Sequence, residues 1–128
     1  MPKVLISGAS GFIAGHCILE MLSHGYEVRG TLRDAARGEA IKAILANHTD
    51  RIDALEFVSA DLMDEASWVE AARGCDSILH VASPVPVVQP EDEDEVIIPA
   101  RTGSLNVLKA ATANGIKRVV LTLSLIHI

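Results

Sequence analysis

Cysteine and aromatic residues are scarce in this sequence. Its 128 residues include two Cys, one Trp, one Tyr and two Phe. Cys17 and Cys75 belong to no Cys-x-x-Cys motif and have no nearby pair of histidines at ligand spacing. We therefore predict two reduced, half-buried thiols and no metal site.

Basic residues and long apolar runs are also few. The chain has 11 Lys and Arg against 17 Asp and Glu, a formal net charge of -6, whereas nucleic acids are bound by clustered basic side chains. The longest apolar run near the start, Val4 to Ile6, is too short for a signal peptide or a membrane span. These absences predict a cytoplasmic protein with neither a nucleic-acid nor a membrane partner, and they leave the oligomeric state open.

The hydrophobic content, 49% of 128 residues, is enough for one core and too little for two domains. Apolar β-type stretches at residues 4–7, 26–32, 54–60, 77–82 and 117–123 alternate with helical patterns at residues 12–23, 35–47, 64–73 and behind the acidic run 91–95, ending near residue 114. This alternation predicts a doubly wound parallel α/β sheet of the Rossmann type. Right-handed crossovers give the strand order 3-2-1-4-5, with the ligand crevice between strands 1 and 4.

The stretch from Val4 to His16 has the pattern of a phosphate-binding turn. A strand leads directly into Gly8 and Gly11, and a helical pattern opens at Phe12. Gly8 would let the chain leave the strand in a tight turn, and Gly11 would let the backbone approach a pyrophosphate with no Cβ in the way. The first amide groups of the helix would then face the diphosphate. An ordinary strand–turn–helix unit is the alternative interpretation, because small residues at this spacing are a weak signal alone.

The end of the second predicted strand indicates which dinucleotide the site would take. Arg33 lies there, about twenty residues after Gly11, followed by Asp34 and Arg37. An acidic side chain at this place binds the ribose hydroxyls of NAD, whereas a guanidinium suits the additional phosphate of NADP. We therefore predict NADP, with NAD as the alternative. Arg33 and Asp34 could instead form a solvated turn without a ligand.

Asp61 follows the third predicted strand, at the edge where open α/β sheets bind ligands. It could receive the adenine amino group, or it could be an N-cap or loop carboxylate, and the spacing alone favours neither. Trp68, in the helical pattern that follows, is predicted to be a packing residue.

The fourth predicted strand leads into a loop with two prolines, which forbid a helix there and keep the backbone extended. The backbone of Val81, Ala82 and Ser83 is then free to line a cofactor channel. His80 could be a general base, but a hydrogen-bonded structural histidine is more common in an apolar strand, and we favour that interpretation.

Several motifs together have the sequence of a known family. They are Gly8-Ala9-Ser10-Gly11-Phe12-Ile13-Ala14, Gly30-Thr31-Leu32-Arg33-Asp34, Asp61-Leu62, His80-Val81-Ala82-Ser83-Pro84, Pro99-Ala100 through Gly103 with Asn106-Val107-Leu108, and Lys117-Arg118-Val119-Val120-Leu121-Thr122. Over almost the whole chain the sequence resembles the extended short-chain dehydrogenase/reductases of the NAD-dependent epimerase/dehydratase superfamily. The resemblance is greatest to the branch of dihydroflavonol reductases, cinnamoyl-CoA reductases and yeast-type aldehyde/ketone reductases.

The resemblance implies a role for each motif in binding NADP. Ser10, Gly11, Phe12 and Ile13 would hold the diphosphate after the turn at Gly8. Arg33 would bind the 2′-phosphate, Asp61 and Leu62 the adenine, and Val81, Ala82 and Ser83 would lie beside the nicotinamide ribose. The family often has a Lys seven residues after the Arg, where this chain has Ala40, so that either Arg37 or no second cation serves.

The end of the chain departs from the family. In the family, the fifth strand closes in Thr-Ser-Ser, and the second Ser orients the substrate carbonyl. This chain has Thr122-Leu123-Ser124 at the same place, so Ser124 matches the catalytic serine. The family's Tyr-x-x-x-Lys is absent, because Tyr26 is followed four residues later by Gly30. Residues 1–124 are therefore expected to be an incomplete Rossmann domain, truncated after strand 5, with residues 125–128 as a tail unlike the family.

The resemblance implies the N-terminal cofactor-binding part of an NADP-dependent oxidoreductase that reduces an aldehyde or ketone to an alcohol by hydride transfer, so the partner would be a small carbonyl compound. The alternatives are an NAD-dependent nucleotide-sugar epimerase or dehydratase and a non-catalytic NADP-binding module. Without the Tyr–Lys pair, which would protonate the product, this chain is expected to bind nucleotide and to turn over no substrate.

Overall fold

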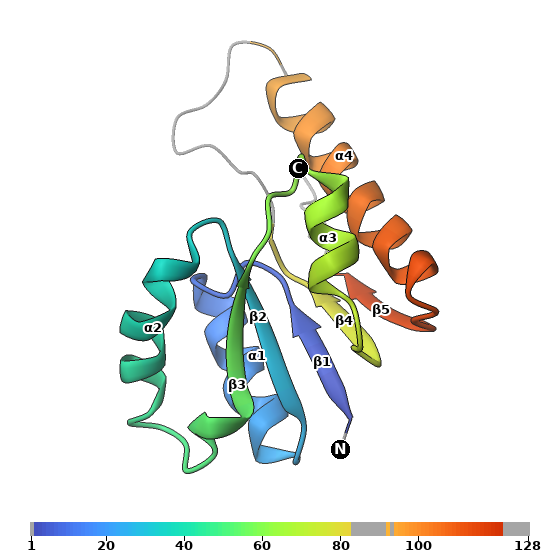
Figure 1. Ribbon diagram of the computed structural model, residues 1–128. Helices are drawn as coiled ribbons and strands as arrows, with labels where there is room; N and C mark the ends of the chain where they lie inside the picture. Colours follow the sequence, from blue (N-terminus) through green and yellow to red (C-terminus); the bar gives the residue numbers. More distant parts are fainter. Residues whose placement is uncertain (1, 83–91, 93, 122–128) are drawn as a thin grey trace, which may run out of the picture.

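The computed structural model describes residues 2–82, 92 and 94–121. Along the chain the elements are β1 (Lys3–Ile6), α1 (Phe12–Ser23), β2 (Glu27–Leu32), the 3-10 helix η1 (Ala35–Arg37), α2 (Gly38–Leu45), the 3-10 helix η2 (Ile52–Ala54), β3 (Leu55–Ser59), α3 (Glu65–Ala71), β4 (Ser77–His80), α4 (Asp94–Ala113) and β5 (Arg118–Leu121) (Figure 1).

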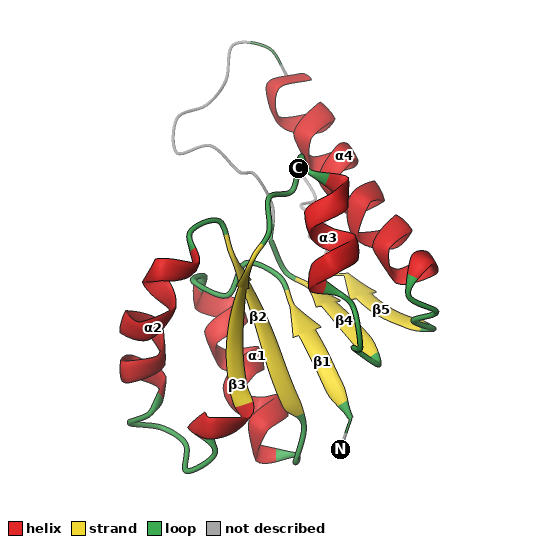
Figure 2. Cartoon of the chain, viewed as in Figure 1, coloured by secondary structure: helices red, strands yellow, loops and turns green. Residues whose placement is uncertain are grey.

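The strands form one parallel sheet in the order β3-β2-β1-β4-β5, which confirms the predicted topology. Helices α1 and α2 cover one face of the sheet, and α3 and α4 cover the other (Figure 2). The chain changes face in the connection from β3 to β4, which passes over β1. The loops that follow β1 and β4 therefore diverge at the carboxyl edge of the sheet, and this divergence opens a crevice there.

The central strand β1 shows why its sequence is apolar without alternation. Val4 and Ile6 pack in the cluster beneath α1, whereas Leu5 packs in the cluster beneath α3 and α4. All three side chains have 0% exposure. A parallel strand that is covered on both faces requires this continuous apolar run.

The prediction of a helix over residues 35–47 is wrong at its beginning. The first turn is the 3-10 helix Ala35–Arg37, and α2 occupies only Gly38–Leu45. The Arg37 amide bonds to the Asp34 carbonyl at 3.2 Å, and the Asp34 carboxylate accepts the Ala36 amide at 3.0 Å. These short-range bonds tighten the entry to the helix.

The fourth strand is also shorter than the predicted range 77–82, because β4 ends at His80. The amides of Val81 and Ala82 donate to the Ser7 hydroxyl, at 2.8 and 2.9 Å. These two amides are therefore bonded to a side chain at the point where the strand was expected to continue.

Trp68 is 1% exposed and packs in the cluster beneath α3 and α4, which confirms its predicted packing role. Cys17 is half-buried, as predicted, but Cys75 is buried. Burial raises the pKa of the Cys75 thiol, and the nearby Arg29 guanidinium opposes that shift. Within the described part of the chain, no helix combines the length and apolar character needed to cross a membrane.

Candidate functional site

A cavity of about 440 Å³ lies at the carboxyl edge of the sheet, where the loops after β1, β2, β3 and β4 meet. Residues predicted from the sequence to bind the cofactor line it from four separate loops: Gly8, Ser10, Gly11, Arg33, Asp61, Leu62, Val81 and Ala82. The remaining lining residues, which sequence reasoning did not assign to the site, are Thr31, Leu32, Ala60, Met63, Trp68 and Pro99. Parallel strands therefore bring together motifs that are up to 74 residues apart in the chain, as between Gly8 and Ala82.

Gly8 makes the turn that leads out of β1. Its φ of 66° lies in the left-handed region, and a Cβ at this position would lie 3.0 Å from the Cα and the Cβ of Ala82. Glycine is therefore required both by the backbone conformation and by the close approach of the β4 loop. The Gly11 amide donates to the Gly8 carbonyl at 2.9 Å, which closes the turn just before α1.

The N-terminus of α1 has no side-chain cap. Gly11 is the N-cap residue, and no hydrogen bond between described residues uses the amides of Phe12 or Ile13. Their side chains are exposed, by 82% and 56%, and do not line the cavity. Any role of these two residues in the site therefore rests on their backbone amides, at the positive end of the helix dipole.

Thr31 on β2 holds the turn at Gly8 in place through two hydrogen bonds. Its Oγ1 accepts the Gly8 amide at 3.2 Å, and its carbonyl accepts the Ala9 amide at 2.9 Å. The neighbouring Gly30 lets the turn lie close to β2, because a Cβ there would be 2.8 Å from the Ala9 Cβ and 2.9 Å from the Phe57 ring. Both residues belong to a motif that the sequence singled out, but their function depends on contacts between strands.

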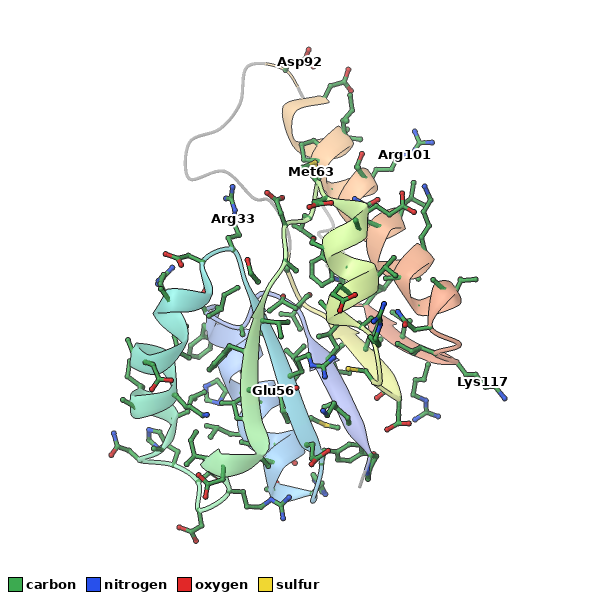
Figure 3. All side chains as sticks on the ribbon, in the orientation of Figure 1. Arg33, Glu56, Met63, Asp92, Arg101 and Lys117 are labelled. Atoms are coloured by element: carbon green, nitrogen blue, oxygen red, sulfur yellow. The ribbon has the colours of Figure 1, made fainter. Side chains whose placement is uncertain are left out.

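Arg33 follows β2 and lines the same cavity as Gly8 and Gly11. Its side chain is exposed and extends beyond the end of the strand (Figure 3). Among the described residues it takes part in no hydrogen bond or ion pair through its guanidinium, whereas Asp34 forms the following turn. Arg37, the alternative second cation, does not line the cavity.

The loop after β3 is held in place by a hydrogen bond of its own and by α4, on the face of the sheet opposite α1 and α2. The Asp61 carboxylate accepts the Met63 amide at 2.9 Å, so that it acts as a loop carboxylate, one of its two predicted roles. The Leu62 carbonyl accepts a hydrogen bond from Asn106 Nδ2 at 2.7 Å. The Leu62 side chain lies over Gly103, where a Cβ would approach it to 3.0 Å. Asp61 and Leu62 therefore present a fixed edge to the cavity.

His80 is buried and bonded, which confirms the interpretation as a structural histidine. Its Nδ1 lies 2.8 Å from Ser7 Oγ, and its ring meets the Trp68 ring edge to face with centroids 6.3 Å apart. Burial lowers the pKa of the His80 imidazole. Two other predicted site residues, Ser83 and Ser124, lie outside the described residues, as does the tail 125–128.

Comparison with known proteins gives a match to the profile of the NAD dependent epimerase/dehydratase family over residues 4–125. The chain belongs to this family. This membership confirms the resemblance on which the sequence interpretation rested, and the five-stranded sheet of this family member has the predicted order.

The curated proteins that are similar to this family member are reductases. It is 42% identical over 123 residues to tetraketide alpha-pyrone reductase 1 of Arabidopsis thaliana. The aligned region covers 95% of this chain and 37% of that protein. It is 40% identical over 128 residues to aldehyde reductase 2 of Sporidiobolus salmonicolor, covering 94% and 35%. The dihydroflavonol 4-reductase of Zea mays is 37% identical over 124 residues, covering 94% and 34%.

Solved structures of similar proteins have the same fold. Gre2 of Candida albicans in complex with NADPH has a TM-score of 0.78 and 29% identity, over 94% of this chain and 36% of that one. Vestitone reductase from alfalfa has a TM-score of 0.71 and 28% identity, over 94% and 36%. This family member therefore spans about a third of the length of the proteins it resembles.

Proposed function

We propose that this chain is the dinucleotide-binding part of an NADP-dependent oxidoreductase that reduces an aldehyde or a ketone to an alcohol. The observation that carries the proposal is that one cavity is lined by the Gly8 turn, by Gly11 at the N-terminus of α1 and by Arg33. The reductase names of the relatives, and the NADPH bound to a Gre2 structure, support it.

The cavity and the adjoining N-terminus of α1 fit a dinucleotide in three independent respects. A Cβ at Gly8 would occupy the narrow space between the turn and Ala82. The amides of Phe12 and Ile13, together with the α1 dipole, suit an anion that bridges two nucleosides. Arg33 offers a fork of donors that the described part of the protein leaves unused.

Each group of residues predicted from the sequence then has a role in the proposed site. Ser10, Gly11, Phe12 and Ile13 bind the diphosphate, Arg33 binds the 2′-phosphate, and Asp61 with Leu62 borders the adenine. Val81, Ala82 and Ser83 border the nicotinamide ribose, and Ser124 orients the carbonyl of the substrate. When bound, NADPH supplies the hydride, while the protein supplies orientation and excludes water.

The chain's tyrosine is placed where it takes no part in this chemistry. Tyr26 precedes β2, at the amino edge of the sheet, whereas the cavity is at the carboxyl edge beyond Leu32. Its side chain packs against the core cluster beneath α1. We therefore propose that the present chain binds dinucleotide without reducing a carbonyl compound.

Calorimetric titration with NADP+ and NAD+ tests the proposal. We expect NADP+ to bind about tenfold more tightly or better, and Arg33→Ala to remove most of that preference. Lys117→Ala is a matched control, because it removes one positive charge at the opposite edge of the sheet (Figure 3). Absence of binding by either dinucleotide would overturn the proposal, and a preference for NAD+ would favour a nucleotide-sugar epimerase or dehydratase.

A further inference from the structure

A buried polar pair lies beneath the candidate site. Ser7 follows β1 with 0% exposure, and His80 ends β4 with 5% exposure. Ser7 Oγ lies 2.8 Å from His80 Nδ1, 2.8 Å from the Val81 amide nitrogen and 2.9 Å from the Ala82 amide nitrogen. One hydroxyl therefore joins the ends of two central strands.

The protons at this junction can be counted. A hydroxyl has one proton and two lone pairs. The amides of Val81 and Ala82 donate to Ser7 Oγ and occupy both lone pairs. The Ser7 proton is then donated to His80 Nδ1, which must carry no proton itself. The arrangement requires a neutral His80 ring with its proton on Nε2.

The junction determines where one wall of the cavity lies. Val81 and Ala82 both line the cavity, and Ala82 is the residue that a Cβ at Gly8 would meet at 3.0 Å. The hydroxyl therefore holds the β4 loop against the turn that is proposed to bind the diphosphate. A displaced loop would change the width of the crevice between β1 and β4.

We propose that Ser7 and His80 are positioning residues of the dinucleotide site, and that protonation of His80 releases the β4 loop and weakens dinucleotide binding. This inference rests on the proposed function. A protonated ring would bring a third N–H to an oxygen that already accepts two, so that at least one of the three hydrogen bonds must break.

Burial lowers the pKa of the His80 imidazole. Among the described residues, the ring contacts Ser7 after β1 and Trp68 on α3, and the backbone of His80 pairs with Leu121 on β5; none of these three side chains is ionisable in the relevant range. The described charged side chains of α3, α4 and β5 and the loop carboxylate of Asp61 are all exposed: Asp61, Glu65, Glu70, Asp94, Arg101, Lys109 and Arg118.

Substitutions at the pair separate positioning from a general loss of structure. In His80→Asn the side-chain oxygen can still accept the Ser7 proton, but it does not titrate. Ser7→Ala removes all three bonds. His24→Asn is the matched control, since His24 is exposed and pairs only with Glu20 on its own helix among the described residues.

The experiment measures dissociation constants for NAD+ and NADP+ between about pH 8 and about pH 5, where histidine titrates. NAD+ is needed because it lacks the 2′-phosphate, whose own second pKa is about 6. We expect the affinity of the unsubstituted chain for NAD+ to fall about tenfold or more toward acid pH, the His80→Asn profile to be flat, and Ser7→Ala to bind about tenfold more weakly at every pH.

An NMR measurement of the His80 ring nitrogens provides a second readout that needs no ligand. At about pH 8 the proton should be on Nε2, with Nδ1 unprotonated. A proton on Nδ1, or an acid loss of affinity that His80→Asn retains, would overturn the inference. Failure of the unsubstituted chain to bind either dinucleotide at any pH would instead overturn the proposed function, and the NMR result would still decide whether the pair is neutral as argued.

Discussion

Asn106 on α4 donates a hydrogen bond from Nδ2 to the Leu62 carbonyl at 2.7 Å, and so fixes the loop after β3 to a residue 44 positions later in the chain. Asn106 is buried, whereas Leu62 lines the cavity. A residue that does not line the cavity thus determines the position of one of its edges.

Asn106→Ala should destabilise the fold by about 1–2 kcal/mol, because the Leu62 carbonyl loses its buried donor. The same substitution should weaken NADP+ binding several-fold through displacement of the loop. Asn114→Ala is the control, because Asn114 Nδ2 donates to the carbonyls of Val69 and Ala110, which do not line the cavity. Thermal unfolding and calorimetry measure the two effects; equal loss of affinity in both variants would contradict the expectation.

Gly30→Ala should lower both stability and dinucleotide affinity. Its Cβ would lie 2.8 Å from the Ala9 Cβ and 2.9 Å from a Phe57 ring carbon, so either the turn or the ring must move. Gly15→Ala places a Cβ on α1 that meets no described atom within 4 Å beyond the backbone of its own helix, and it should stabilise the helix by about 0.5–1 kcal/mol. Chemical denaturation with and without NADP+ compares them, and an unchanged affinity in Gly30→Ala would show that the turn does not depend on this close approach.

Arg29→Met should destabilise the protein by about 2–3 kcal/mol without changing its preference between NADP+ and NAD+. The Arg29 guanidinium donates to the Glu56 carboxylate at 2.7 Å and to the carbonyls of Ala71 and Arg73 at 2.7 and 2.6 Å, which ties β2 to β3 and to the end of α3. None of these residues lines the cavity. A changed cofactor preference in this variant would contradict the separation of the two regions.

The carboxylate partner of Arg29 gives an acid-dependent contribution to stability. The hydrogen bond from Arg29 holds the pKa of Glu56 below its usual value, against a smaller opposing effect of burial. Stability from this pair is therefore present above about pH 4.5 and is lost as the pH falls through the lowered pKa. Since the Glu56 side chain is about half exposed, Glu56→Gln should remove less than about 1 kcal/mol, measured as a flatter stability profile at acid pH.

His80 should contribute a separate pH dependence of stability. Its pKa is lowered in the folded state by burial, so the unfolded chain binds more protons between that pKa and the ordinary value of about 6.5. Stability is therefore complete above about pH 6.5 and falls as the pH decreases through the lowered pKa. Urea unfolding of His80→Asn should lack this slope, whereas His24→Asn should retain it.

The topology and most of the cavity could be predicted because they depend on patterns local to each segment. The sequence itself shows the apolar run from Val4 to Ile6, the glycines of the first turn and the basic residue after β2. Because the strands are parallel, the residues that follow each strand come together at one edge of the sheet. The early end of β4 could not be predicted, because it depends on the Ser7 side chain from another strand. The same holds for Thr31 and Asn106, whose partners become neighbours only in the folded chain.

Arg33 differs from the turn at Gly8 and the loop at Ala82 in that no hydrogen bond or ion pair between described residues uses its side chain. The turn at Gly8 and the loop at Ala82 are built into the core, so changes there alter the whole domain. At the proposed site, changes at position 33 are expected to act on the nucleotide alone. Exchange of one electron carrier for another at the proposed site then needs a surface substitution and no repacking of the interior.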